Sequence, residues 1–305
     1  MILNIIFMGT PEFAVPTLKS IVESKHKILE VYTQPPQKKN RGQKIQSSPI
    51  HDFSKKLDIP VNHPSNLGKN EVDHIKKLKP DLVIVVAYGK ILPNELLNLN
   101  KVLFINVHAS LLPKWRGAAP IQRAIMNMDQ ETGISIMKIV PKLDAGPILM
   151  QSKIKITQEI NHQELSDKMS KLGAKLILDT IKLIENNKVN FIEQNEAEVT
   201  YAKKIQKTET KINWNDSADK VIAKINAFYP NPGSWFELNG IRIKVIKARE
   251  IISKGLPGTI LNDKFTIACS KNAIQIIELK KEGKQIMTTE DFLRGNEIKI
   301  GLTLN

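Results

Sequence analysis

The sequence has a single cysteine, few aromatic residues and no long hydrophobic run. Cys269 is the only cysteine in 305 residues, which excludes an intramolecular disulfide framework and a zinc site built from several cysteines. The longest apolar stretch, residues 82–88, is far shorter than the roughly 20 residues of a transmembrane helix. We therefore expect a protein of the reducing cytoplasm that does not associate with a membrane.

Three easily recognised motifs are also missing. Gly9 follows a first apolar run, but the second and third glycines of a dinucleotide-binding Gly-x-Gly-x2-Gly motif are absent, which disfavours a nicotinamide or flavin enzyme. The 6 histidines show neither His-x3-His nor His-Glu-x2-His spacing, so we expect no bound metal. No basic segment precedes the apolar residues 1–8, so we expect a buried strand there and not a signal peptide.

What the chain does have is an ordinary globular composition with an excess of basic residues. It is 41% hydrophobic and 25% charged, and its length allows two compact domains. The formal net charge of +14 favours association with polyanions. This charge divides equally between the first 200 residues and the last 105, so the C-terminal part is about twice as basic per residue.

The first half of the chain alternates short β-branched apolar runs with amphipathic stretches, which predicts an α/β domain with a largely parallel sheet. We expect strands at residues 2–8, 27–32, 81–87, 102–107, 132–140 and 147–156. We expect helices at residues 11–24, 49–57, 71–79, 117–128 and 162–187. Ser48 is the expected N-cap of the second helix, with Pro49 at its first position, and Asn161 with Glu164 resembles a capping box.

The C-terminal part differs because short strands follow one another closely. We expect a helix at 216–228 and then strands at 234–239, 241–249, 257–261, 264–269 and 273–279. Asn239-Gly240 is a strong signal for a two-residue hairpin turn, and the strand spacing predicts a small β-barrel or sandwich. We place the first domain at 1–188, a linker without sustained periodicity at 189–209 and the second domain at 210–305.

The densest group of polar residues lies between residues 104 and 117. Because side chains alternate along a strand, Asn106 and His108 should project to the same face at the carboxyl end of a strand, where open α/β sheets hold their ligands. The amide could hold a developing oxyanion while the imidazole handles the proton of an attacking nucleophile, as acyl transfer requires. The alternative is a polar strand end that only caps the next loop.

Asp144 could complete this pair. It lies in a tight Gly/Pro turn at residues 142–147 between two apolar strands, which would bring its carboxylate to the same end of the sheet. There it would orient the imidazole and make it a better base. The alternative is an Asx-type turn residue that bonds its own backbone.

A third feature is the long loop at residues 33–49. It carries four basic and no acidic residues, namely Lys38, Lys39, Arg41 and Lys44. Connections in α/β units are usually a few residues long, and longer loops tend to be functional. We expect this loop to be disordered until it binds a phosphate backbone, the alternative being a mobile loop whose charges only aid solubility.

Three stretches are more specific than these polar residues. They are Gly-Thr-Pro-Glu-Phe at 9–13, the basic loop that ends in Ser-Pro, and Ser-Leu-Leu-Pro-Lys-Trp-Arg-Gly at 110–117. With Asn-x-His and the downstream Asp, which folate-dependent formyltransferases share in general, the whole chain resembles the methionyl-tRNA formyltransferase family. The string Tyr-Pro-Asn-Pro-Gly at 229–233 differs from the Asn-Pro-Trp-Pro-Gly of the family at its first and third residues.

The resemblance implies a Rossmann-type formyltransferase domain followed by a smaller OB-fold-like β-barrel domain that binds tRNA. It implies 10-formyltetrahydrofolate as the donor and initiator methionyl-tRNA as the acceptor, and we expect a monomer that binds neither DNA nor metal. The residues it assigns are Asn106, His108 and Asp144 to catalysis, Ser110, Leu111, Leu112 and Pro113 to the folate site, Phe13 to the methionine side chain, and Arg41 to the acceptor end of the tRNA. From the charge of the same loop we expect Lys38, Lys39 and Lys44 to contact the tRNA as well.

The expected reaction is direct attack of the neutral methionyl amine on the formyl carbon. Asn106 would donate to the oxyanion, and the sequence leaves open whether His108 or Asp144 takes the proton. One alternative is a formyltransferase or hydrolase acting on a small metabolite, which would need no basic surfaces. Another is a non-enzymatic nucleic-acid-binding protein, for which the base-stacking aromatic residues are sparse at 5%.

Overall fold

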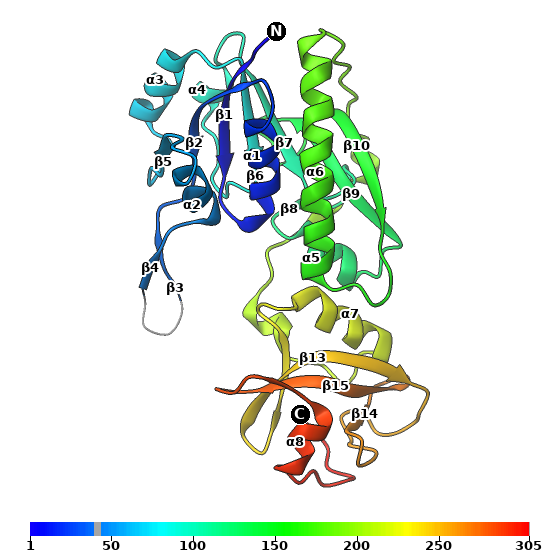
Figure 1. Cartoon of the computed structure of the whole chain (residues 1–305). Helices are drawn as coiled ribbons and strands as arrows, with labels where there is room; N and C mark the ends of the chain where they lie inside the picture. Colours follow the sequence, from blue (N-terminus) through cyan, green and yellow to red (C-terminus); the bar gives the residue numbers. More distant parts are fainter. Residues whose placement is uncertain (40–43, 305) are drawn as a thin grey trace. The chain divides into compact units, whose positions relative to one another are not determined.

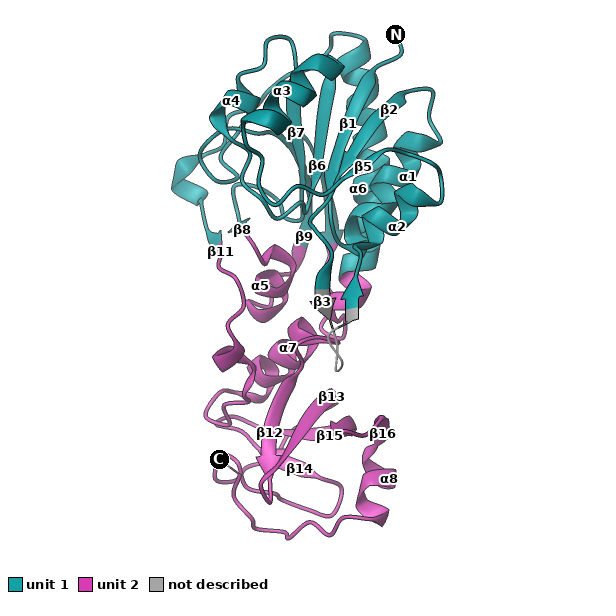
Figure 2. Cartoon of the chain, turned by 90° about the vertical axis from the view of Figure 1, so that its left-hand side faces the viewer, with its two compact units in different colours: residues 1–117, 132–154, 166–201 teal, residues 118–131, 155–165, 202–305 magenta. Residues whose placement is uncertain are grey.

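A computed structural model of the chain describes residues 1–39 and 44–304 (Figure 1). The chain divides into two compact units whose segments alternate along the sequence (Figure 2). Unit 1 consists of residues 1–117, 132–154 and 166–201, and unit 2 consists of residues 118–131, 155–165 and 202–305. The segment expected as a linker, 189–209, is therefore divided between the two units.

Unit 1 is built on a seven-stranded sheet with the order β10-β9-β7-β6-β1-β2-β5. Its strands are β1 (Asn4–Gly9), β2 (Lys27–Tyr32), β5 (Val61–Asn62), β6 (Leu82–Val86), β7 (Leu103–His108), β9 (Glu131–Lys138) and β10 (Ile148–Lys155). The strands from β5 to β7 across the sheet pair in parallel, and β9 runs antiparallel to β7. The prediction of an α/β domain with a largely parallel sheet is confirmed.

Helices cover both faces of this sheet, and all the residues of β6 are buried. In Figure 2, α3 (Lys69–Leu78) and α4 (Asn94–Leu97) lie on one side of the strands, whereas α1 (Val15–Val22), α2 (Pro49–Lys55) and α6 (His162–Glu185) lie on the other. The Ser48 side chain caps α2 as expected, because it accepts a hydrogen bond from His51 N. At the start of α6, Asn161 Oδ1 accepts one from Glu164 N at 3.0 Å.

The described part of the loop at 33–49 contains two paired strands. β3 (Gln37–Lys39) and β4 (Lys44–Gln46) are antiparallel, with Lys38 opposite Ile45. At the base of the loop, just after β2 and just before α2, the hydroxyls of Thr33 and Ser48 lie 2.6 Å apart. The backbone groups of β3 and β4 hydrogen-bond to each other, and disorder of the loop before it binds stays a prediction. Arg41 lies outside the described residues.

Unit 2 contains an antiparallel β domain, as predicted. Its strands are β12 (Ser234–Leu238), β13 (Ile241–Ile251), β14 (Thr266–Ala268), β15 (Ala273–Lys281) and β16 (Ile286–Thr288). They form one sheet in the order β12-β13-β15-β14, and β16 pairs with β15. Asn239 and Gly240 form the expected turn between β12 and β13 with φ angles of 51° and 75°. Closure of this sheet into an OB-like barrel stays a prediction.

The expected strand at 257–261 is wrong. The structure has only isolated bridges there, from Thr259 to Thr303 and from Ile260 to Ile267. Gly258 has a φ of 88°, in the left-handed region, so an extended strand does not run through it.

The core of unit 2 is aromatic. The rings of Trp214, Phe236, Phe265 and Phe292 follow one another with centroid distances of 5.6, 6.0 and 5.8 Å. Around them lie α7 (Ala218–Phe228), α8 (Thr289–Arg294) and the buried sides of β12, β13 and β15. In the same unit α5 (Pro120–Met126) packs against α7. Although the chain has few aromatic residues, unit 2 has an aromatic core because most of its aromatic side chains pack together there.

Candidate active site

Asn106 and His108 lie at the carboxyl end of β7, the strand between β6 and β9. Their side chains are on the same face of the strand because side chains alternate with a period of two. The His108 side chain is buried, whereas Asn106 is half-buried. Among the described residues, nothing hydrogen-bonds to the Asn106 side chain, so both of its amide protons are available to a ligand.

The His108 ring is held between a carbonyl and a carboxylate. Its Nε2 lies 2.9 Å from Trp115 O, and its Nδ1 lies 3.6 Å from Asp144 Oδ2. Because a carbonyl oxygen only accepts, Nε2 carries a proton in this arrangement, and Nδ1 of the neutral ring then presents a lone pair. A proton taken up at Nδ1 would therefore be placed directly opposite the carboxylate. The predicted meeting of the imidazole with Asp144 occurs in the structure.

Asp144 lies in the turn between β9 and β10 and has a φ of 46°, which is uncommon outside glycine but tolerated by aspartate. Its Oδ2 accepts a hydrogen bond from Gly117 N at 2.8 Å. The turn itself depends on Gly146, because a Cβ there would lie 1.8 Å from Lys138 O. Gly146 thus allows the backbone of the turn to adopt its shape, and the N–H of Gly117, distant in sequence, holds the Asp144 carboxylate in place.

The segment after β7, which the resemblance assigns to the folate site, is held by hydrogen bonds to side chains of β9 and β10. Ser135 Oγ donates to Ser110 O at 2.6 Å and accepts from Leu112 N at 3.0 Å. Gln151 Nε2 donates to Leu112 O at 2.9 Å. Sequence reasoning missed Ser135 and Gln151, because nothing in the surrounding sequence marks them.

The four residues of that segment are not equally accessible. Ser110 is fully buried and its Oγ donates to Lys114 O at 2.6 Å, so this hydroxyl already has a partner within the loop. Leu112 is also buried, whereas Leu111 and Pro113 are half-buried. The accessible apolar contribution of this segment therefore comes from Leu111 and Pro113.

The carboxyl end of β1 lies at the same edge of the sheet as the end of β7, because these strands are parallel. Phe13 is half-buried in the short 3-10 helix η1 (Glu12–Ala14), which follows β1. Thr10 Oγ1 and Gln34 Nε2 both donate to Tyr88 O, at 2.9 and 3.0 Å, and so tie together the segments that follow β1, β2 and β6. The structure places Phe13 at this edge, and its contact with methionine stays a prediction.

Three of the basic residues predicted to meet tRNA belong to the paired strands β3 and β4. Lys38 and Lys39 belong to β3 and Lys44 belongs to β4, whereas Arg41 falls outside the described residues. A second basic cluster, which sequence reasoning missed, lies on unit 2. Arg242 stacks over the Trp235 ring at 3.8 Å from its centroid, and Lys211 lies 6.0 Å from the same centroid.

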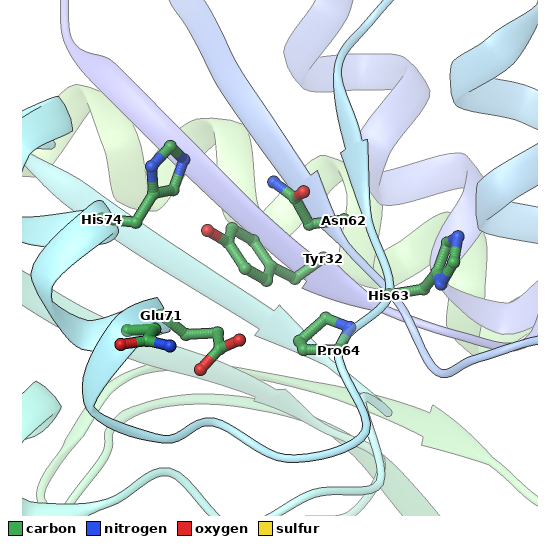
Figure 3. A pocket seen from close by; sticks show the side chains of 7 residues that line it. Tyr32, Asn62, His63, Pro64, Glu71 and His74 are labelled. Carbon is green, nitrogen blue, oxygen red and sulfur yellow. The ribbon is translucent and has the colours of Figure 1, made fainter.

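A separate cavity of about 400 Å³ contains none of the predicted site residues. Figure 3 shows side chains from α3, β5 and the loop after β5 around the ring of Tyr32. Three of its lining residues share Glu30 as a partner, since Tyr32 Oη and Asn62 Nδ2 both donate to Glu30 Oε2, at 3.1 and 2.7 Å, and His74 Nε2 lies 2.9 Å from Glu30 Oε1. We assign no role to this cavity.

Residues 1–39 and 44–304 contain neither a metal cluster nor a membrane-spanning helix. No group of three or more His, Cys, Asp or Glu side chains there is arranged to hold a metal ion. Within the same residues, no helix is both long and apolar enough to cross a membrane.

Known proteins of similar sequence show the family to which the chain belongs. Residues 3–181 match the formyl transferase family, and residues 204–297 match the formyl transferase C-terminal domain. The methionyl-tRNA formyltransferase of Pelagibacter ubique is 47% identical over 97% of this chain and 96% of its own length. The methionyl-tRNA formyltransferase of Bradyrhizobium diazoefficiens is 41% identical over 98% of each chain. The chain belongs to the methionyl-tRNA formyltransferase family.

Solved structures of more distant proteins share the fold of this member of the methionyl-tRNA formyltransferase family. An N-formyltransferase from Helicobacter canadensis, in complex with folinic acid and dTDP-3-aminofucose, has a TM-score of 0.70 and 21% identity over 90% of this chain and 99% of its own. HypX from Aquifex aeolicus, in complex with tetrahydrofolic acid, has a TM-score of 0.68 and 16% identity over 99% of this chain and 51% of its own. These likenesses support the fold described above.

Proposed function

We propose that this chain transfers the formyl group of 10-formyltetrahydrofolate to the α-amino group of the methionine carried by initiator tRNA. The observation that carries the proposal is the pairing of His108 with Asp144 next to Asn106, at the carboxyl end of β7. The proposal is supported by the 47% identity of the chain, over nearly its whole length, to a methionyl-tRNA formyltransferase. We also propose that the enzyme acts as a monomer in the cytoplasm.

The residues at the sheet edge fit a formyl donor of this kind. Asn106 offers an amide that no described residue occupies, and Leu111 and Pro113 offer half-buried apolar surface after the same strand. We propose that the segment from Ser110 to Pro113 holds the folate, with Leu111 and Pro113 in contact and with Ser110 shaping the loop from inside. When bound, 10-formyltetrahydrofolate supplies the electrophilic formyl carbon that the methionyl amine attacks.

Asn106 would stabilise the charge that develops during this attack. Its Nδ2 would donate a hydrogen bond to the formyl oxygen as negative charge accumulates there. Strand β7 holds the backbone of Asn106 in place, and one such donor typically contributes about 10²–10³ in rate. The half-burial of Asn106 supports this role, because hydrogen bonds are stronger where water is partly excluded.

His108 would take the proton of the attacking amine at Nδ1. Nε2 is engaged with Trp115 O at 2.9 Å, which leaves Nδ1 as the basic nitrogen. The Asp144 carboxylate, 3.6 Å away, would stabilise the imidazolium that results, and a water molecule could relay the proton to the ring. This geometry favours His108 over Asp144 as the proton acceptor.

The basic residues of both units would bind the tRNA. On unit 2, Lys244 Nζ donates to Pro232 O at 2.6 Å, and burial, followed by the charges of Lys280 and Arg242, lowers the pKa of its ammonium group. Positive charges held close together repel one another, and a bound polyanion offsets this unfavourable repulsion. We propose that the basic cluster of unit 2, formed by Lys211, Arg242, Lys244 and Lys280, binds phosphates of the tRNA. We propose that the loop with Lys38, Lys39, Arg41 and Lys44 contacts the acceptor end.

The test is formyl transfer by the purified protein from 10-formyltetrahydrofolate, with methionyl initiator tRNA, glycinamide ribonucleotide and free methionine as parallel acceptors. We expect transfer to the charged tRNA alone. The logarithm of the affinity for tRNA should also fall with the logarithm of the salt concentration, by roughly 0.7–0.9 per phosphate neutralised. Transfer only to a small amine, or hydrolysis without an acceptor, would overturn the assignment of the substrate.

A further inference from the structure

A segment at residues 192–200, here called the strap, is hydrogen-bonded to both parts of the candidate active site. At one end Ile192 pairs with Ile148, at the start of β10, through two backbone hydrogen bonds of 2.8 and 2.9 Å. At the other end Thr200 O accepts from Arg116 N at 2.9 Å, and Thr200 Oγ1 accepts from Trp115 N at 2.9 Å. The strap thus spans from the Asp144 turn to the segment that follows β7.

Gln194 connects these two parts directly from the middle of the strap. Its Nε2 donates to Asp144 O at 2.9 Å and to Gly146 O at 2.7 Å. Its Oε1 accepts from Arg116 Nε at 3.0 Å and from Arg116 Nη2 at 2.9 Å. Gln194 is buried and Arg116 is fully buried. All donors and acceptors of the Gln194 amide are therefore used, which fixes its orientation.

Glu196 reinforces the same connection from the outer side. Its two carboxylate oxygens bond Arg116 Nη2 and Lys142 Nζ, each at 2.8 Å. These hydrogen bonds, that of Arg116 first, lower the pKa of Glu196 to about 2, so it is charged at neutral pH. Because Glu196 is largely exposed, water can replace part of this contact. Gln194, which is buried, has no such substitute.

The residues that Gln194 joins are those that hold the catalytic pair. Arg116 stands between Trp115, whose carbonyl accepts from His108 Nε2, and Gly117, whose N–H donates to Asp144 Oδ2. Any movement of Arg116 relative to the Asp144 turn would therefore change the distance between His108 and Asp144. The two hydrogen bonds from Gln194 to the carbonyls of Asp144 and Gly146 also hold the left-handed backbone of this turn in place.

We propose that Gln194 is a positioning residue for the formyl-transfer reaction, which sets the separation of His108 and Asp144 by tying Arg116 to the Asp144 turn. This inference rests on the proposed function, in which His108 and Asp144 are catalytic. Misplacing a catalytic group by about 1 Å can cost 10²-fold in rate. Gln194 would thus affect turnover without touching the folate or the tRNA.

Two substitutions separate positioning from simple charge pairing. Gln194→Met removes all four hydrogen bonds at a similar volume. Gln194→Glu keeps an acceptor, and adds a charge, for Arg116 but loses both donors to the carbonyls of Asp144 and Gly146. We expect each variant to lower kcat by roughly 10- to 100-fold while KM for methionyl-tRNA stays within about threefold. Glu193→Gln, at an exposed neighbouring position in the strap, is the matched control and should match the wild type.

The outcomes are distinguishable. If Gln194→Met does not fold because Arg116 is left buried with fewer partners, Gln194→Glu still carries the test, since it keeps that arginine paired. A wild-type kcat for Gln194→Glu would overturn the positioning role and leave Gln194 as a partner for the arginine charge alone. A rise in KM with an unchanged kcat would overturn it as well. Absence of formyl transfer by the wild-type enzyme would instead overturn the proposed function.

Discussion

The His108–Asp144 pair predicts that Asp144→Asn lowers kcat strongly while the turn keeps its structure. Asparagine has nearly the same size as aspartate and tolerates the left-handed φ of 46° found here. Its Oδ1 can accept the hydrogen bond that Gly117 N donates to the carboxylate at 2.8 Å. The substitution therefore removes the negative charge beside the imidazole and little else.

The size of the effect follows from the distance and the burial. Asp144 Oδ2 lies 3.6 Å from His108 Nδ1, and the two side chains are 13% and 6% exposed. Coulomb's law gives about 4.6 kcal/mol for unit charges at this distance with an effective dielectric constant of about 20, and about 1.2 kcal/mol with that of water. Since about 1.4 kcal/mol corresponds to a factor of ten, kcat should fall by about 10- to 10³-fold.

The assay is formyl transfer at saturating 10-formyltetrahydrofolate and methionyl-tRNA, with the melting temperature of each variant as the check on folding. Asp58→Asn is the matched control, because Asp58 is exposed in unit 1 and also has a left-handed φ, of 52°. The control should leave kcat unchanged. A kcat of Asp144→Asn within about threefold of the wild type would refute the idea that the Asp144 charge stabilises a protonated His108.

Three other substitutions test single contacts. Asn106→Ala should lower kcat by about 10²–10³-fold and leave the Kd for tRNA nearly unchanged, which single-turnover kinetics can separate. Gly146→Ala should destabilise unit 1 by about 1–3 kcal/mol in chemical denaturation, because its Cβ would lie 1.8 Å from Lys138 O; an unchanged stability would contradict that approach. Hydrogen bonds from Arg123 lower the pKa of Glu209 below its ordinary 4.5, so the charged form stabilises the fold above that pH and the contribution is lost as the pH falls through the lowered pKa. Glu209→Gln should therefore reduce the free energy of unfolding at pH 7 and have a shrinking effect towards acid, whereas an equal loss at every pH would count against this reading.

The parts of the fold that sequence reasoning predicted are those encoded in short segments. The strands of the parallel sheet follow apolar β-branched runs, Ser48 caps its helix, and Asn239-Gly240 forms the turn that its backbone preferences favour. The prediction failed at 257–261, where apolar composition suggested a strand but Gly258 turns the chain. It did not foresee β3 and β4, because their polar and basic composition gives no strand signal although the two segments pair with each other.

By itself, the sequence determined the candidate side chains for formyl transfer. The period of a strand places Asn106 and His108 on one face, and a Gly/Pro turn between two apolar strands places Asp144 at the same end of the sheet. Only the tertiary structure decided how those groups are held. Gln194 bonds the backbone of Asp144 from 50 positions away, and Arg116 bonds Glu196 across 80. No local pattern encodes such contacts, because they depend on where distant backbone segments meet once the sheet has formed and on the need of buried polar groups for partners.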